Sequence, residues 1–127
     1  MGRAFRTRSF TRWMRKAGVN DSGLLAALRE MALGLIDAEL GGHLVKKRLA
    51  LPGQGKRGGA RMVVATKREG KWFFLYGFEK NERSNLDKDE LKALQEVAKE
   101  LLEFDDRELA VALTAGELVE VHDVENA

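Results

Sequence analysis

The amino-acid sequence predicts a single α+β domain, with helices packed on a mostly antiparallel sheet in the order β-α-α-β-β-β-α. Three observations predict this class. Both ends of the chain hold segments with apolar residues at the 3–4 spacing of a helix. The middle holds short runs that alternate, or are continuously apolar, as strands do. A length of 127 residues suits one hydrophobic core. We therefore expect a sheet packed by an N-terminal helical hairpin and a C-terminal helix.

The first forty residues predict a strand followed by the helical hairpin. Residues 3–7 are expected to form an edge strand, and Ser9 or Thr11 to cap a short helix that ends at Gly18. A second helix is expected to begin at residues 20–22 and to run to Gly41-Gly42. Its apolar positions recur every three or four residues: Leu24, Leu25, Leu28, Met31, Ala32, Leu35 and Ile36.

Residues 44–78 predict three strands that pair as a meander. The first strand, 44–51, alternates weakly, and a glycine-rich loop at 52–60 separates it from the second, 61–67. A hairpin turn at 68–70 leads to the third, 72–78, which is apolar on both faces and should therefore be central. Its aromatic side chains are expected on one face, with their default role in the core: Trp72, Phe74, Tyr76 and Phe78.

The C-terminal third predicts two helices with similar beginnings. Asp87 with Glu90, and Asp105 with Glu108, have the spacing of a capping box. The tail from Gly116 is expected either to add a strand or to fray. We assign residues 1–104 to the main domain and residues 105–127 to an acidic helix-and-tail extension of the same domain.

Composition excludes several kinds of protein. The chain has no cysteine, so disulfides, thiolate metal sites and cysteine nucleophiles are ruled out. Two histidines far apart in the sequence, without a carboxylate cluster on the basic part of the chain, predict no metal site. No apolar run approaches the roughly 20 residues that span a bilayer, and no signal-peptide pattern follows the arginine-rich start. We expect a cytoplasmic protein without a cofactor.

The charge is divided unevenly along the chain. Residues 1–84 hold 18 Lys and Arg against 7 Asp and Glu, a net charge of +11, while residues 85–127 hold 4 against 13, a net charge of −9. A basic body attracts a polyanion such as RNA. Alternatively, the basic sheet simply packs beside an acidic helix and the charges partly cancel.

The cations gather around the predicted strands and loop. Lys46 and Arg48 share one strand face, about 7 Å apart, and Arg61 begins the neighbouring strand. If the three strands form a meander, these residues converge at one end of one sheet face with four further basic residues of the loop and strand ends: Lys56, Arg57, Lys80 and Arg83. The loop lacks the Ser or Thr of a phosphate-binding Walker motif, and a strand follows it instead of a helix.

Such a group of cations can cleave RNA without a metal. The 2′-hydroxyl of RNA supplies the nucleophile, so the protein needs a base, an acid and positive charge for the pentacovalent phosphate. Lysines crowded by other cations have lowered pKa values and suit the base, whereas arginine suits charge stabilisation. Phe78, nearest the cationic end, is the aromatic residue best placed to stack on a base.

Two segments resemble the RelE/HigB branch of the type II toxins. One is the run 46–61, Lys-Lys-Arg-Leu-Ala-Leu-Pro-Gly-Gln-Gly-Lys-Arg-Gly-Gly-Ala-Arg; the other is 77–86, which contains Lys80-Asn81-Glu82. The order and lengths of the elements agree from about Phe5 to Leu102. The resemblance implies a microbial-ribonuclease-like fold, cleavage of mRNA in the ribosomal A site, and inhibition by a cognate antitoxin with a helix-turn-helix domain.

The resemblance also implies roles for particular residues. The predicted catalytic set is Lys46, Arg48, Lys56, Arg61 and Lys80, and the predicted RNA-binding set is Lys47, Arg57, Phe78 and Arg83. RelE has an important Tyr near the end of its last strand, where this sequence has Phe78 and Lys80, with Tyr76 two residues earlier. The lysines are therefore expected to take over part of its role. Residues 105–127 have no counterpart in short members and are expected to pack beside the basic body or to help bind the antitoxin.

Two other functions remain open at this stage. A relative of ParE would poison DNA gyrase through a protein contact, with an SOS response and no mRNA cleavage. A non-catalytic RNA-binding or regulatory domain would bind RNA with a steep salt dependence but would not cleave it.

Overall fold

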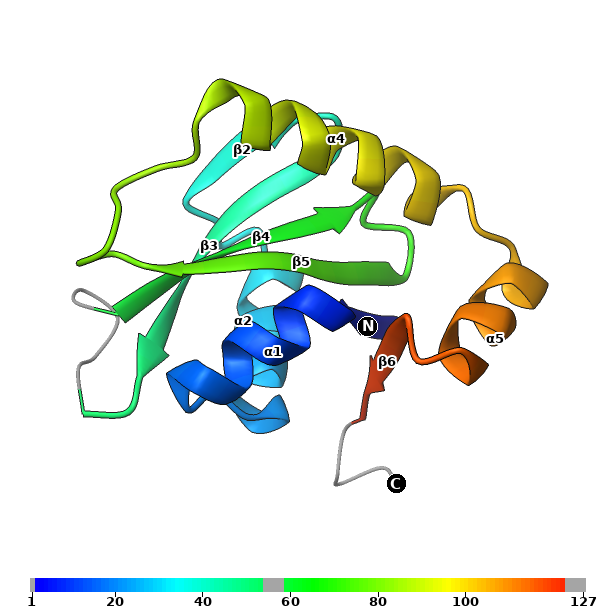
Figure 1. Ribbon diagram of the computed structural model, residues 1–127, viewed down its shortest axis with the longest axis horizontal. Coiled ribbons are helices and arrows are strands. Elements are labelled where there is room, and N and C mark those ends of the chain that lie inside the picture. The colour runs from blue at the N-terminus through cyan, green and yellow to red at the C-terminus, as the bar shows by residue number, and fades with distance from the viewer. Residues whose placement is uncertain (1, 54–58, 123–127) are drawn as a thin grey trace.

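The computed structural model describes residues 2–53 and 59–122 and confirms the predicted α+β class (Figure 1). The elements follow in this order: β1 (Arg3–Thr7), α1 (Arg8–Ala17), α2 (Asp21–Ala32), β2 (Ala38–Gly41), β3 (Leu44–Leu51), β4 (Gly59–Thr66), β5 (Lys71–Glu79), α4 (Lys88–Leu102), α5 (Asp106–Thr114) and β6 (Leu118–Val121). Residues 118–121 of the tail thus form a strand, and β2 is a strand that the sequence did not predict.

The six strands of the described residues belong to one sheet, in the order β2-β3-β4-β5-β1-β6. β2 to β5 are joined as antiparallel neighbours, which confirms the meander of β3, β4 and β5. β1 pairs parallel with β5, and β6 pairs antiparallel with the other side of β1. The prediction of an edge strand at residues 3–7 is therefore wrong, because the C-terminal strand covers the edge that β1 would otherwise expose.

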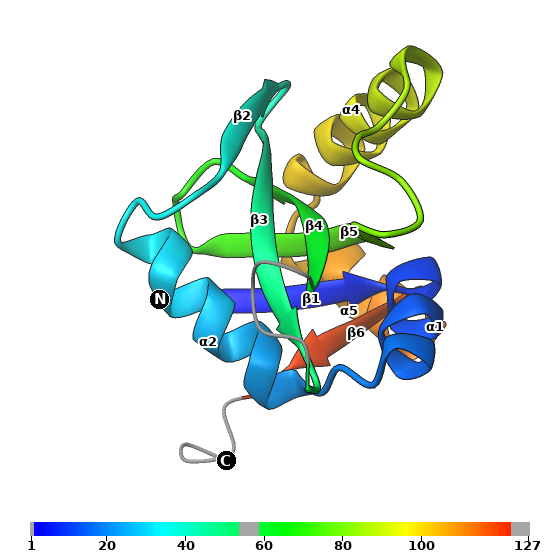
Figure 2. The same ribbon diagram turned by 90° about the vertical axis from the view of Figure 1, so that its left-hand side faces the viewer.

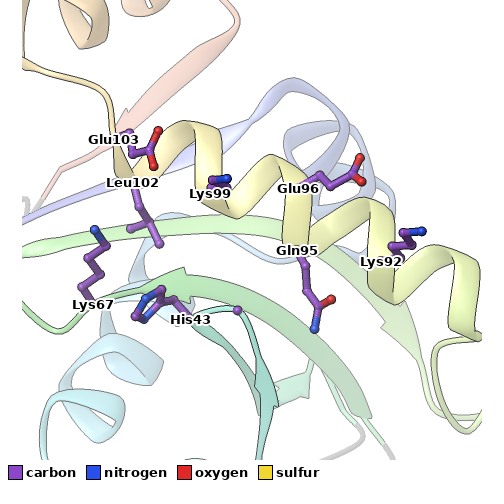
Figure 3. Close-up of a pocket in the computed structure, with 9 residues that line it drawn as sticks. His43, Lys67, Lys92, Gln95, Glu96, Lys99, Leu102 and Glu103 are labelled. Carbon is purple, nitrogen blue, oxygen red and sulfur yellow. The ribbon is translucent and has the colours of Figure 1, made fainter.

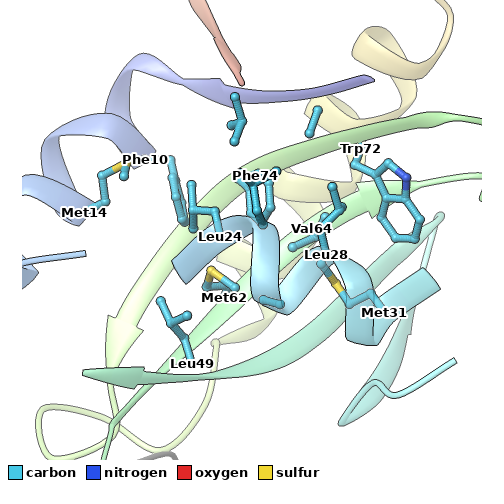
Figure 4. Packing of buried hydrophobic residues seen from close by; sticks show 14 of the residues in the cluster. Phe10, Met14, Leu24, Leu28, Met31, Leu49, Met62, Val64, Trp72 and Phe74 are labelled. Atoms are coloured by element: carbon cyan, nitrogen blue, oxygen red, sulfur yellow. The ribbon is translucent and has the colours of Figure 1, made fainter. Parts of the chain in front are cut away.

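Each face of the sheet carries its own hydrophobic core. Figure 1 shows α1 and α2 on one side of the sheet and α4 on the other, and Figure 2 shows the same layers from the side. On the first face, side chains of α1 and α2 close on β3, β4 and β5; Phe10 lies 5.5 Å from Phe74 between ring centroids (Figure 4). On the second face, Phe73 and Leu75 are buried beneath α4 and α5. β5 is central and covered on both faces, as predicted, with helices supplying both covers.

The two N-terminal helices begin and end at identifiable signals. The side chain of Thr7 accepts the Phe10 N–H and caps α1, so the expected caps at Ser9 and Thr11 are wrong. Asn20 caps α2 as predicted. This helix ends at Ala32, not at Gly41, because Gly34 adopts a left-handed φ of 88° and the Leu35 N–H donates to the Glu30 carbonyl.

A β-bulge in β5 separates the aromatic residues that were expected on one face. Val63 and Val64 are consecutive on β4, yet they pair with Tyr76 and Phe74, so Leu75 is an extra residue on β5. The extra residue reverses the alternation of side chains beyond it. Trp72 and Phe74 therefore face α1 and α2, whereas Tyr76 packs with the core under α4 and Phe78 contacts Tyr76.

Candidate functional site

A row of three side chains crosses the sheet where β3 ends, β4 begins and β5 ends. Arg48 of β3 pairs with Arg61 of β4, and Arg61 pairs with Phe78 of β5. Directly paired residues on neighbouring strands point to the same face, with backbones about 5 Å apart. The three side chains therefore lie beside one another on the face that α4 covers elsewhere.

A carboxylate lies between the two arginines of this row. Oδ2 of Asp37 is 3.0 Å from Nε of Arg48 and 3.6 Å from Nε of Arg61. The Arg48 side chain is 53% exposed, whereas those of Arg61 and Asp37 are 11% and 16% exposed. Nη1 of Arg61 also donates to the carbonyl of Ala60. Arg48 is thus the arginine that reaches solvent, and Arg61 supports the row from beneath.

Two lysines lie near the row. Lys46 is two residues before Arg48 on β3 and therefore points to the same face, opposite Val63. Lys80 follows β5 and is exposed, and its backbone N–H donates to the carbonyl of Gly59, the first residue of β4. Lys46 thus lies beside the arginine pair along β3, and the backbone of Lys80 lies at the end of β5 next to the beginning of β4.

Arg83 is held against the aromatic end of the row. Its guanidinium forms an ion pair with Glu90, and Nη1 also lies 3.1 Å from the hydroxyl of Tyr76. The same guanidinium lies over the Phe78 ring, 5.7 Å from its centroid. Glu90 also accepts the backbone N–H of Asp87 in the capping box of α4. The beginning of α4 is therefore tied to the segment that follows β5 through one carboxylate.

The contacts among Arg83, Glu90 and Tyr76 shift the pKa values of all three side chains. Hydrogen bonds from Arg83 lower the pKa of Glu90 to about 2, and Glu90 in turn raises the pKa of Arg83. Burial raises the pKa of Tyr76, and the neighbouring charge of Glu90 raises it further. At neutral pH Glu90 is ionised, Arg83 is charged and Tyr76 keeps its proton, so the phenol acts as a hydrogen-bond donor to Glu90 at 3.3 Å.

The structure does not bring every predicted site residue to this face. Lys47 lies on the opposite face of β3, 5% exposed, with its Nζ 2.8 Å from Glu30 of α2. Lys56 and Arg57 lie outside the described residues. Arg48, Arg61, Phe78, Lys46 and Arg83 do share one end of one sheet face, and the backbone of Lys80 lies at the same end of the sheet.

Three residues of this face were missed from the sequence as members of the site. Asp37 fell inside a helix that was expected to continue to Gly41, and Glu90 was recognised only as a capping residue. Tyr76 was assigned to the aromatic core face. Gly34 could have shown from the sequence that the helix ends before Asp37. A left-handed glycine ends a helix and places the next residues in a connection or strand.

A separate hollow of about 590 Å³ lies between α4 and the turn that joins β2 to β3 (Figure 3). Gln95 and Leu102 of α4 line it together with His43 and Lys67. His43 is five residues before Arg48, about 16 Å along the strand. The hollow therefore lies at the other end of β3 from the arginine row.

Within residues 2–53 and 59–122, no helix combines the length and the apolar character that crossing a membrane requires. In the same ranges, no group of three or more His, Cys, Asp and Glu side chains is arranged to hold a metal ion.

A mostly antiparallel sheet with a helical layer on each face is consistent with a RelE-like fold. The family described as the RelE toxin of the RelE/RelB toxin–antitoxin system matches residues 2–121. The chain therefore belongs to the RelE toxin family and is the toxin of a toxin–antitoxin system, which implies an antitoxin partner. The matched region includes α5 and β6. No curated protein matches the chain significantly.

Proposed function

We propose that this toxin is a ribosome-dependent endoribonuclease that cleaves mRNA in the A site, and that its antitoxin neutralises it. The observation that carries the proposal is the direct pairing of Arg48 with Arg61 on adjacent strands, with Lys46 on the same face. Guanidinium groups on neighbouring strands offer several donors within the span of one phosphate group. Activity on translating ribosomes would place the protein in the cytoplasm.

The proposed reaction uses the nucleophile that RNA itself carries. A base removes the proton of the 2′-hydroxyl, the 2′-oxygen attacks the adjacent phosphorus, and an acid protonates the departing 5′-oxygen. Arginine stays protonated, so Arg48 and Arg61 suit stabilisation of the negative charge on the pentacovalent phosphate. Lys46 and Lys80 are the described residues that we propose for the proton transfers. Tyr76, whose pKa is raised by burial, suits donation of a hydrogen bond better than removal of a proton.

Recognition of a base is proposed at the other end of the row. Phe78 is 3% exposed, and the guanidinium of Arg83 lies over its ring. A guanidinium plane can itself stack on a base. We therefore propose that Arg83 presents the stacking surface and that Phe78 supports it from below.

The predicted loop residues keep a place in this proposal. Lys56 and Arg57 belong to the stretch that connects β3 to β4 in the sequence, between the two strands that carry Arg48 and Arg61. We propose that they add phosphate contacts and, for Lys56, a catalytic role.

The decisive experiment maps mRNA 5′ ends after induction of the toxin, with and without active translation. We expect growth arrest and new 5′ ends that depend on translation, and loss of both for the double variant Lys56→Ala with Arg61→Ala. Arg68→Ala is the matched control, since Arg68 is an exposed arginine in the turn at the opposite end of the β4–β5 hairpin. A double variant that stays toxic would show that the assigned site is wrong.

Two further measurements, of the SOS response and of RNA binding, separate the alternative functions. An SOS response without new 5′ ends would indicate a ParE-like effect on gyrase. RNA binding with a steep salt slope, without cleavage on translating ribosomes, would indicate a non-catalytic RNA-binding protein.

A further inference from the structure

Asp37 is an acidic residue placed within the basic face by the sheet itself. Its backbone N–H donates to the carbonyl of Lys46 at 2.8 Å, so the backbone just before β2 is fixed to β3. The side chain is only 16% exposed and points to the arginine pair. Its carboxylate is thus anchored at the main chain and shielded from solvent.

The contact with Arg48 is made through Nε of its guanidinium. Oδ2 of Asp37 accepts from Nε of Arg48 at 3.0 Å, and the two terminal amino groups of the guanidinium lie beyond this bond on a side chain that is 53% exposed. A guanidinium fixed through Nε can still present a fork of two donors to phosphate oxygens. The bond therefore orients Arg48 without using up the donors that face outward.

The contact with Arg61 reduces the repulsion between the two guanidinium groups. Arg48 and Arg61 are directly paired across two strands, and like charges in that position destabilise a sheet. Arg61 is also 11% exposed, so water screens its charge poorly. One carboxylate oxygen 3.0 Å from the first guanidinium and 3.6 Å from the second offsets this repulsion.

We propose that Asp37 is the positioning residue of the cleavage site: its carboxylate holds Arg48 and Arg61 side by side so that the scissile phosphate meets donors already in place. The proposal rests on the proposed ribonuclease function. Asp37 acts through the arginines and takes no proton from RNA. Substitution of Asp37 lowers the rate of cleavage, because the two arginines are no longer held in place. It leaves RNA affinity equal or higher, because removing the negative charge makes the face more positive.

The first test compares Asp37→Asn with Glu39→Gln on programmed ribosomes. Glu39 is two residues away and also pairs with an arginine, Arg68, but through an exposed contact at the far end of the β4–β5 hairpin. We expect Asp37→Asn to lower the single-turnover cleavage rate about tenfold or more, with no loss of ribosome affinity, and Glu39→Gln to leave both within about twofold. Equal losses of rate and affinity, or an unchanged rate, would overturn the proposal.

The second test asks whether Asp37 acts through Arg48. In an Arg48→Ala background, Asp37→Asn should change the rate by no more than about threefold, because both the Arg48 guanidinium and its repulsion with Arg61 are gone. A loss as large as in the wild type would show that Asp37 itself takes part in the chemistry, and the positioning role would be wrong.

A third measurement does not depend on cleavage. The Arg48 Nε–H signal in ¹H–¹⁵N NMR spectra should shift and exchange faster in Asp37→Asn but not in Glu39→Gln, and a short single-stranded RNA should perturb it in the wild type. If this pattern holds and the wild type does not cleave mRNA, the ribonuclease function is wrong while the positioning of Arg48 stands. An Arg48 Nε–H signal that is unchanged in Asp37→Asn would refute the positioning role, whether or not the protein cleaves mRNA.

Discussion

Gly77 of β5 is a position where a single added methyl group should destabilise the fold. An ideal Cβ on Gly77 would lie 2.3 Å from Cε3 and 2.5 Å from Cδ2 of Trp13, which crosses the strand from α1. Carbon atoms in contact prefer about 3.5–4.0 Å, so the indole ring would have to move by more than about 1 Å. The ring cannot shift freely, because it packs 5.4 Å from the buried ring of Phe10.

The expected cost follows from overpacking. Inserting a methyl group into a filled contact costs about 1–3 kcal/mol of the free energy of unfolding, equivalent to a fall in Tm on the order of 4–12 °C for a domain of this size. The φ of Gly77 is outside the left-handed region, so the backbone alone does not require glycine. The penalty for Gly77→Ala therefore comes from Trp13.

Urea denaturation of Gly77→Ala, with and without Trp13→Ala, measures this cost directly. In the Trp13→Ala background the penalty should disappear, or turn slightly favourable by about 0.5 kcal/mol, because alanine is less flexible than glycine in the unfolded chain. A Gly77→Ala variant as stable as the wild type would refute the steric reasoning. So would an equal penalty in both backgrounds.

Three further predictions concern charge and the C-terminal segment. Glu30→Ala should lower the free energy of unfolding by about 3 kcal/mol, because it leaves the ammonium of Lys47 buried without this partner. Lys47→Met should be nearly neutral for stability in urea denaturation and should leave RNA cleavage intact. Loss of cleavage in Lys47→Met would return Lys47 to the RNA-binding set. The pKa of Glu90 is lowered in the folded protein to about 2, so its stabilising contribution is present above its unfolded pKa near 4.5 and is lost as pH falls towards 2. Acid titration followed by circular dichroism should therefore show a flatter decline over that range for Glu90→Gln, and parallel curves would contradict the assignment. Deleting residues 105–127 removes β6 and exposes an edge of β1, so the protein should become less soluble and its antitoxin affinity should change. Unchanged solubility by gel filtration and unchanged affinity in binding assays would reject a role for this segment.

Several features were predictable because their physical cause is local. The capping boxes at Asp87 and Asp105 depend on residues three positions apart, and both occur in the structure. The hairpin turn at 68–70 was predicted from its own composition and joins β4 to β5. Alternation within residues 44–51 placed Lys46 and Arg48 on one face of β3.

Other features depended on contacts between distant segments. The bulge at Leu75 arises from the register of β5 against β4, and it alone decides that Phe78 lies on the arginine face rather than with Phe74. The end of α2 at Ala32 brings Asp37 beside Arg48, although the two residues are 11 positions apart. Lys47 looked like its basic neighbours, and only the packing of α2 on β3 shows that its charge is paired with Glu30.

By itself, the sequence determined the class of fold, the family resemblance and the set of cations proposed for the candidate site, because spacing and charge along the chain are sufficient for these. Tertiary structure decided which cations share a face and which carboxylates hold them. Arg48 and Arg61 become neighbours only when their strands pair, and Asp37 joins them only because the chain leaves α2 early. Electrostatic interactions depend on distance in space, and a change of one residue in strand register or helix length moves a side chain to another face.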